Sequence, residues 1–292
     1  MVQYENRQPT EDINVPVTHP LKTFAVYAVS ALVLVVMVAV ILQFAGGFIA
    51  KRVPFSVETR VVEAVGLELG SADASPEMVS YLNELATRLL PYIELPEGMS
   101  VDIHYDEQNV FNAFATLGGN LLFYRGLLSV LPNENALAMV LAHEIAHVLH
   151  RDPAAAIGGG VASALALAGL TGNAGTGPAA GVLSRAGMVT GMQFTRRMEV
   201  AADEVAVIAV GGLYGHTAGA ADLFLAIAAQ RSEGSINTSD DSPGVFERFA
   251  STHPLDADRI AAIQASAEKH GIATEGATTP LPDEFRDWLS DN

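Results

Sequence analysis

Two histidines and a glutamate stand close together in the stretch His143-Glu144-Ile145-Ala146-His147. On an α-helix, residues four apart lie on one face, so His143 and His147 can offer imidazole nitrogens to one metal ion. Glu144 follows the first histidine and can act as general base for a water molecule at that ion. Burying these side chains as mere core residues of an apolar helix would be costly, so the spacing favours a metal site.

A catalytic zinc ion usually has three protein ligands, so this motif is one ligand short. A histidine six residues after the second motif histidine would complete one known arrangement, but this chain has a proline there. The other option is a glutamate on a later helix, and Glu199 is followed one turn later by Asp203. We expect Asp203 to accept a hydrogen bond from a ligand histidine. A surface helix whose acids are balanced by Arg196 and Arg197 is the alternative. We therefore predict one Zn²⁺ ion bound by His143, His147 and Glu199.

One further histidine, His253, stands at a loop-to-helix junction in the run Ser251-Thr252-His253-Pro254. It could stabilise a tetrahedral oxyanion during catalysis. It could instead occupy the open position on the metal and hold the enzyme latent. A structural or capping histidine is the default interpretation of such a residue. The residues alone leave all three roles open.

The motif needs a helix to hold it, and its flanks predict one. Pro132-Asn133 forms a turn and an N-cap, and Pro153 ends the run. Apolar residues recur between them at helical spacing. Other helices are expected at 75–90, at 193–210, from 251 to about 269, and at 283–289, with strands at 101–106 and within 110–124. A polar loop is expected at 232–245.

The two strands predicted within 110–124 meet at Gly118-Gly119. A strand that precedes a zinc helix can bind substrate, because an extended peptide can add to an exposed sheet edge through backbone hydrogen bonds. A plain hairpin packed on the core is the alternative, and composition alone favours it.

Composition excludes several classes of protein. The chain has 292 residues, no cysteine and a formal net charge of -17. Without cysteine there are no disulfides, thiolate zinc sites or cysteine nucleophiles. The negative charge argues against nucleic acid as a partner and against docking on anionic lipid.

One apolar run, residues 24–50, is long enough to cross a bilayer and carries no charge. It is too long for a signal peptide, so we expect an uncleaved anchor that follows a polar tail at 1–23. A peptidase domain would occupy 51–270 and an acidic tail with a short docking helix 271–292. Residues 153–184 are also uncharged, but they are small and broken at 171–178. We expect two helices there, packed on the protein and outside the lipid.

Four motifs in order resemble a known family. His143-Glu144-x-x-His147 is followed by Arg196-x-x-Glu199-x-x-Ala202-Asp203 and by Ser251-Thr252-His253-Pro254 with Arg259-Ile260. Asn112-Ala113-Phe114-Ala115 precedes them, followed by Gly118-Gly119 and Arg125-Gly126-Leu127-Leu128. Together they resemble the HtpX / CaaX prenyl protease type of membrane-associated zinc metallopeptidase, a gluzincin. The likeness runs from about residue 54 to 264.

The resemblance implies a mostly helical α+β zincin-type domain with a small β-sheet, preceded by one transmembrane helix. It implies that Glu144 is the catalytic base, that His253 has a regulatory or transition-state role, and that Asn112, Ala113, Phe114 and Ala115 lie along the substrate. The single span separates the chain from the multi-span prenyl proteases. In this respect the chain is similar to single-anchor or envelope members of the family.

The expected function is a membrane-anchored zinc endopeptidase for misfolded membrane or envelope proteins. Its partners would be an unfolded protein or peptide substrate and the bilayer around 24–50. A membrane-tethered chaperone or assembly factor with a latent or structural zinc site is the alternative. The expected location is the bacterial inner membrane. Basic residues near the span weakly favour a cytoplasmic domain, whereas the resemblance implies a periplasmic one, which we adopt.

Overall fold

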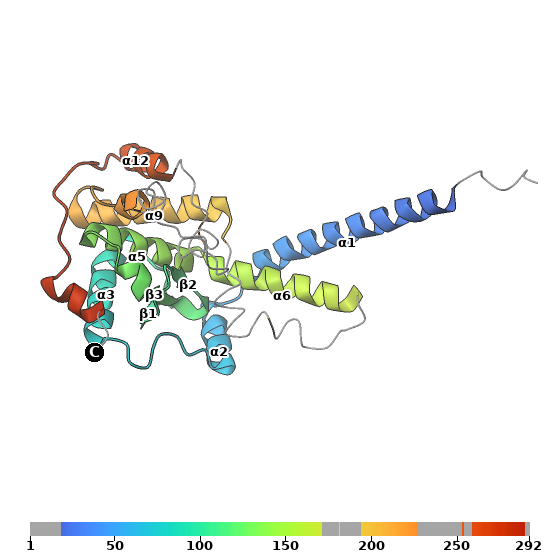
Figure 1. The fold of residues 1–292 in the computed structure, drawn as a ribbon, viewed down its shortest axis with the longest axis horizontal. Coiled ribbons are helices and arrows are strands. Elements are labelled where there is room, and N and C mark those ends of the chain that lie inside the picture. Colours follow the sequence, from blue (N-terminus) through green and yellow to red (C-terminus); the bar gives the residue numbers. More distant parts are fainter. Residues whose placement is uncertain (1–18, 171–180, 182–193, 227–252, 254–258, 290–292) are drawn as a thin grey trace, which may run out of the picture.

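A computed structural model of the chain describes residues 19–170, 181, 194–226, 253 and 259–289. In Figure 1 a globular body lies at one end, and two helices, α1 and α6, project from it side by side. Several expectations lie outside the described residues. They are the tail at 1–18, the break at 171–178, the loop at 232–245 and the helix start at 254–258.

Helix α5, Glu134–Leu149, carries the histidine motif through the middle of the globular body (Figure 1). It begins as predicted, because the Asn133 side chain accepts a hydrogen bond of 2.8 Å from the Ala136 backbone N–H. All of its residues from Glu134 to Val148 are buried. The surrounding apolar core therefore fixes the face that the motif side chains share.

A polar cluster holds the first turn of α5. Glu134 is buried, and its carboxylate accepts hydrogen bonds from Tyr81 Oη at 2.8 Å, Tyr214 Oη at 2.7 Å and Arg88 Nη2 at 2.9 Å. Tyr81 and Arg88 belong to α3, Pro76–Leu89, and Tyr214 ends α9, Arg196–Tyr214. One buried carboxylate thus ties three helices together, and its charge is satisfied by three donors.

A three-stranded sheet covers another side of α5. Strands β1, Asp102–Asp106, β2, Ala113–Ala115, and β3, Asn120–Tyr124, have the order β1-β3-β2. β2 and β3 pair antiparallel, as the predicted strand pair requires, across a 3₁₀ turn, η2, Leu117–Gly119. The two glycines of that turn have φ values of 72° and 78°, which favour glycine. β1 pairs with β3 in parallel, so β2 is an edge strand among the described residues.

The remaining helices surround this core. As predicted, α3 begins with the Ser75 side chain capping Met78 N–H. Near the C-terminus, α12 spans Arg259–Lys269, and a 3₁₀ helix, η3, spans Asp283–Leu289, with Trp288 lying against Tyr81. Helix α2, Phe55–Val65, was not predicted. The short elements η1, Leu90–Tyr92, and α4, Arg125–Leu128, are the other elements in the described part of the body.

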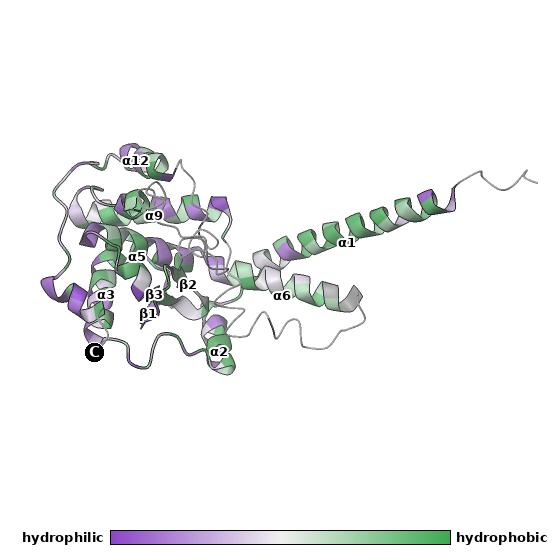
Figure 2. Ribbon diagram, viewed as in Figure 1, coloured by the Kyte–Doolittle hydropathy of each residue, from purple (hydrophilic) through white to green (hydrophobic). Residues whose placement is uncertain are grey.

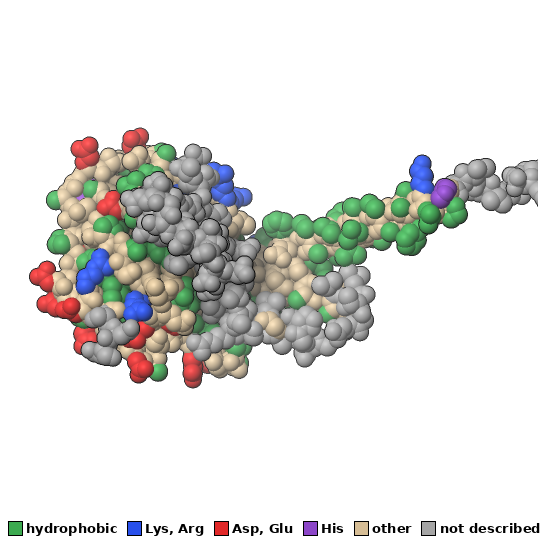
Figure 3. Space-filling model, viewed as in Figure 1, with side chains coloured by type: hydrophobic (Ala, Val, Ile, Leu, Met, Phe, Trp, Pro, Cys, Tyr) green, Lys and Arg blue, Asp and Glu red, His purple; other side chains and the backbone are tan. Residues whose placement is uncertain are grey.

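The two projecting helices are α1, Pro20–Ala50, and α6, Asp152–Leu170. α1 begins at Pro20, before the predicted start of the span at residue 24. Among the described residues it is the one helix long and apolar enough to cross a membrane. Figures 2 and 3 show hydrophobic residues along most of its projecting length. The fold class is the predicted one: mostly helical, with a small sheet and one N-terminal apolar helix.

Candidate metal centre

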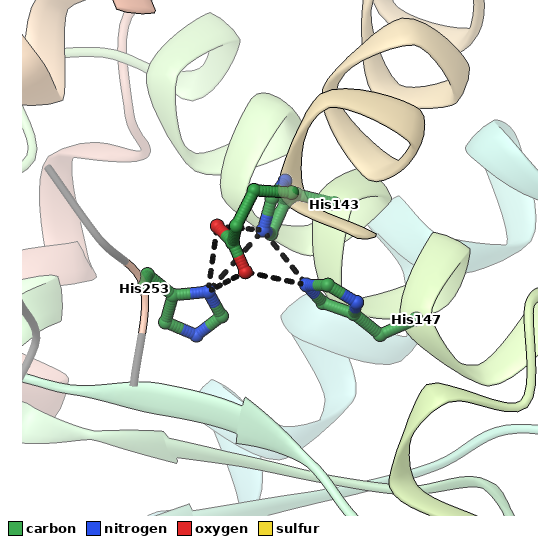
Figure 4. Close-up of side chains that lie close together, drawn as sticks. His143, His147 and His253 are labelled. Atoms are coloured by element: carbon green, nitrogen blue, oxygen red, sulfur yellow. Dashed lines mark hydrogen bonds and ion pairs between the residues drawn. The ribbon is translucent and has the colours of Figure 1, made fainter. Parts of the chain in front are cut away.

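Four buried side chains from three parts of the chain converge beside α5. His143 and His147 come from α5, Glu199 from the first turn of α9, and His253 from the segment before α12. Figure 4 shows the three imidazoles directed toward the carboxylate. One ligand atom from each of the four lies within 4.8 Å of all the others.

The spacing of these atoms fits one shared metal ion. The Nε2 atoms of His143 and His147 are 3.1 Å apart, and they lie 3.5 and 3.4 Å from the Glu199 carboxylate oxygens. Nδ1 of His253 lies 3.4 Å from Nε2 of His143 and 3.2 Å from both Glu199 oxygens. Four ligands at about 2.0–2.1 Å from one zinc ion would be about 3.3–3.4 Å apart. The donor set of nitrogen and carboxylate oxygen also suits zinc.

Glu144 lies beside this cluster without taking part in it. It is buried, and neither of its carboxylate oxygens makes a hydrogen bond with any described residue. Nε2 of His253 lies 3.4 Å from its Oε1. Burying a carboxylate without hydrogen bonds costs free energy. Such a group is expected where a cation or a reacting water completes its surroundings.

The structure places Asp203 against His143, as the sequence predicts for a residue that orients a ligand. Oδ1 of Asp203 lies 2.8 Å from Nδ1 of His143, which leaves Nε2 directed at the cluster. Arg259 on α12 then holds Asp203 through Nε and Nη2, each at 2.8 Å. Nη1 of Arg259 also lies 3.0 Å from Glu199 Oε2.

A second carboxylate, Asp152, orients His147 in the same way. Its Oδ2 lies 2.9 Å from Nδ1 of His147, and its Oδ1 accepts a hydrogen bond of 2.6 Å from Nζ of Lys51. Lys51 directly follows α1, so the end of the apolar helix contacts the support of a candidate ligand. Phe194 stacks on the His147 ring at 4.0 Å between centroids and fixes its plane.

Sequence reasoning missed these roles of Asp152, Lys51, Phe194 and Arg259. Asp152 carried a local signal, since it lies five residues after His147 and begins the next helix, α6. Arg259 appeared in the family resemblance but received no role. Lys51 and Phe194 are distant from the motif, and no local pattern joins them to it.

The charges of the cluster show what a bound cation would replace. Burial opposes a charge on His143, but hydrogen bonds with Asp203 and Glu199 prevail and raise its pKa to about 10. Burial alone would raise the pKa of the Glu199 carboxyl. The charge of His253 and the hydrogen bonds to the other histidines prevail and hold this pKa far below the usual range. The carboxylates therefore favour protonation of His143 and His147. A divalent ion would displace those protons on binding.

The proposed substrate strand lies close by. Ala113, Phe114 and Ala115 form β2, and the Asn112 carbonyl accepts a hydrogen bond of 3.2 Å from the Tyr124 backbone N–H. All four residues are buried, main chain included, so β2 offers no exposed edge in this structure. A peptide can add to this edge only where it is exposed, so strand addition at β2 requires the edge to be uncovered first.

Comparison with known proteins gives the family. A model of peptidase family M48 matches residues 76–267, which is more than half of the chain. The matched range contains α3, the sheet, the histidine motif, Glu199, His253 and Arg259. The chain belongs to peptidase family M48 and is a metallopeptidase.

Curated relatives have a common name. The chain is 32% identical over 143 residues to the beta-barrel assembly-enhancing protease of Escherichia coli K12. The aligned region covers 45% of this chain and 29% of the relative. The chain is 37% identical over 84 residues to the protein of that name from Yersinia pestis, covering 28% of this chain and 17% of the relative. The chain therefore matches less than a third of the length of these relatives.

Proposed function

We propose that this member of peptidase family M48 is a membrane-anchored zinc endopeptidase that cleaves unfolded membrane or envelope proteins. The observation that carries the proposal is the convergence of four ligand atoms within 4.8 Å of one another, with the buried Glu144 carboxylate beside them. We assign His143, His147 and Glu199 as the ligands that hold the ion during catalysis. We assign the chain to the HtpX / CaaX type and its single-anchor branch.

The roles of the side chains follow from their positions. Zinc, when bound, supplies a Lewis acid that polarises a scissile carbonyl and makes water more acidic. Glu144 takes the proton of the attacking water and delivers it to the leaving amine. Its carboxylate is suited to this because no described residue holds it by a hydrogen bond. Asp203 and Asp152 keep the ligand histidines in one tautomer, and β2 aligns the peptide.

The decisive experiment separates metal binding from cleavage. We expect Glu144→Gln to retain zinc and to abolish cleavage of an unfolded protein such as casein. Glu199→Ala should lower the zinc content measured by mass spectrometry. Glu204→Ala is the matched control, because Glu204 lies on the same helix but pairs with the exposed Lys269. Unchanged zinc in Glu199→Ala would reject the third ligand.

One observation favours the second candidate function, a membrane-tethered chaperone or assembly factor with a latent zinc site. Nδ1 of His253 stands at the fourth corner of the ligand set, where a catalytic site keeps an open position. If His253 holds the site latent, His253→Ala should raise proteolysis; a transition-state role predicts the reverse. Full rescue of a deletion phenotype by Glu144→Gln would show that cleavage is not the function.

Location and organisation complete the proposal. Residues 24–50 would form the anchor, 51–270 the peptidase domain and 271–292 an acidic tail docked through η3. The relatives are named for enhancing the assembly of β-barrels, which supports a role in envelope quality control on the periplasmic side of a bacterial inner membrane. A C-terminal reporter that is active on only one side of the membrane tests this. Activity on the cytoplasmic side would reject it.

A further inference from the structure

Helix α6 lies along α1 at unusually close range. A Cβ on Gly47 would come within 2.9 Å of the Ala155 carbonyl oxygen, and a Cβ on Gly159 within 2.7 Å of the Gln43 carbonyl oxygen. Gly46 and Gly158 also meet backbone to backbone. Such contacts require glycine on both helices, and they are typical of helix pairs in membranes.

The polar side chains of the two helices satisfy each other. Ser163 is the only polar side chain on α6 between 153 and 170, and Gln43 is the only strongly polar one on α1 between 24 and 50. Ser163 Oγ donates a hydrogen bond of 2.9 Å to Gln43 Oε1 and lies 3.4 Å from the Ala39 carbonyl oxygen. In an apolar solvent a polar side chain needs such a partner, whereas water would supply one at no cost.

Among the residues that the structure describes, the rest of α6 has little support other than α1. Its main neighbour among the described elements is α1, and Leu165 is 52% exposed. Figure 1 shows both helices leaving the globular body in the same direction. An apolar groove at their junction is lined by Ile49, Val61 and Leu165 among others. A bilayer that surrounds α1 would also meet α6.

We propose that α6 enters the apolar layer of the membrane beside α1, so that the chain contacts lipid through two helices. This rests on the proposed anchoring by α1 and departs from the expectation that residues 153–184 stay outside lipid. Between Lys51, the first charge after the span, and Ala39, α1 rises by about 18 Å. Because Ser163 lies against Ala39, α6 reaches roughly the middle of a bilayer core about 30 Å thick.

The absence of cysteine provides a direct test. Single cysteines at Leu165, at Val33 in α1 and at the exposed Gln264 in α12 are labelled with an environment-sensitive fluorophore in full chains reconstituted into phosphatidylcholine vesicles. All carry Glu144→Gln, so the result does not depend on cleavage. We expect nitroxide-labelled acyl chains to quench the probes at 165 and 33, and iodide to quench only the probe at 264.

The outcomes are distinct. If the probe at 165 behaves like that at 264 while the probe at 33 is quenched by the lipids, α6 lies in water and the proposal is overturned. If the probe at 33 also behaves like that at 264, the anchoring fails as well. If both probes lie in lipid but the chain with Glu144 retained does not cleave casein in the same vesicles, the proposed function alone is rejected.

A cross-link tests the helix pair without relying on a label. Cysteines replacing Ala39 and Ser163 should form a disulfide in the vesicles, whereas Met37, on another face of α1, should not cross-link with position 163. Met37 is 50% exposed. Equal cross-linking of both pairs, or of neither, would contradict the packing on which the proposal depends.

Discussion

The two histidines of the motif are supported by different parts of the molecule. His143 is held by Asp203, which is bound in turn by Arg259, and the Arg259 side chain is only 6% exposed. His147 is held by Asp152, which is bound in turn by Lys51, whose side chain is 34% exposed. The first support lies entirely within the globular body, and the second ends at the apolar helix.

This difference indicates which support depends on the fold and which depends on the anchor. A planar guanidinium bound through two nitrogens defines one geometry for Asp203. An ammonium at the end of a flexible chain defines that of Asp152 less strictly. We therefore expect the His143 side to be rigid, and the His147 side to respond to the position of α1.

The largest effect should come from Arg259→Met. It leaves Asp203 and Glu199 buried without their cation, which typically costs about 3–5 kcal/mol of unfolding free energy. Unfolding by urea in detergent measures this. Lys269→Met on the same helix is the control, because its exposed pair with Glu204 contributes at most about 1 kcal/mol. Equal loss in both variants would remove the distinction between the two supports.

Asp152→Asn should act on the metal more than on the fold. Loss of a carboxylate partner from a ligand histidine typically weakens metal binding about 10–100-fold. Competition with a zinc chelator measures the change, and Asp203→Asn provides the comparison. Affinity equal to that of the unchanged chain would show that Asp152 does not orient His147.

Glu134 tests a buried carboxylate that serves the fold alone. Burial would raise its pKa, but the hydrogen bonds from Arg88, Tyr214 and Tyr81 prevail and lower it. A carboxyl whose pKa is depressed in the folded protein stabilises the fold at pH values above its pKa in the unfolded chain. That stabilisation is lost as the pH falls through the pKa in the folded protein. Glu134→Gln should therefore cost roughly 2 kcal/mol at neutral pH and progressively less in acid.

The measurement is urea unfolding of the unchanged protein and of Glu134→Gln from neutral to acid pH, with the zinc content held constant. A loss that stays the same at every pH would mean that the charge of Glu134 does not contribute.

Lys51→Met should have the smallest effect, since Lys51 is partly exposed. We expect the rate of zinc release to a chelator to rise about twofold to fivefold, in line with a pair worth at most about 1 kcal/mol. Lys51→Arg should restore most of the unchanged rate. Arg52→Met is the control, because Arg52 binds the Phe48 carbonyl oxygen and does not contact Asp152. If Arg52→Met has the same effect, the link from Lys51 is not specific.

Local sequence signals predicted the elements that carry the site. The caps at Asn133 and Ser75 marked where two helices begin, and both caps form the expected hydrogen bonds. The ligand requirement of zinc directed attention to Glu199, which the structure brings to the motif. These successes rest on short spacings, over which backbone geometry dictates which side chains share a face.

The parts that were missed depend on contacts between distant residues. Lys51 and Asp152 are 101 positions apart. The parallel pairing of β1 with β3 joins strands that no short turn connects. Helix α6 was expected beside the protein, but that its neighbour is α1 depends on glycines 112 positions apart, Gly46 and Gly158. Such pairings follow from the packing of the whole chain.

The contact of Lys51 with Asp152 also determines how far the candidate metal centre lies from the bilayer surface. Two hydrogen bonds, of 2.6 and 2.9 Å, separate the end of α1 from a candidate metal ligand. Under the proposed anchoring, no flexible tether lies between the bilayer surface and the centre. Peptide bonds just outside the membrane would be within reach, whereas those in a distant folded domain would have to come down to the surface. The anchor would then select substrates by the distance of the peptide bond from the bilayer surface, independently of their sequence.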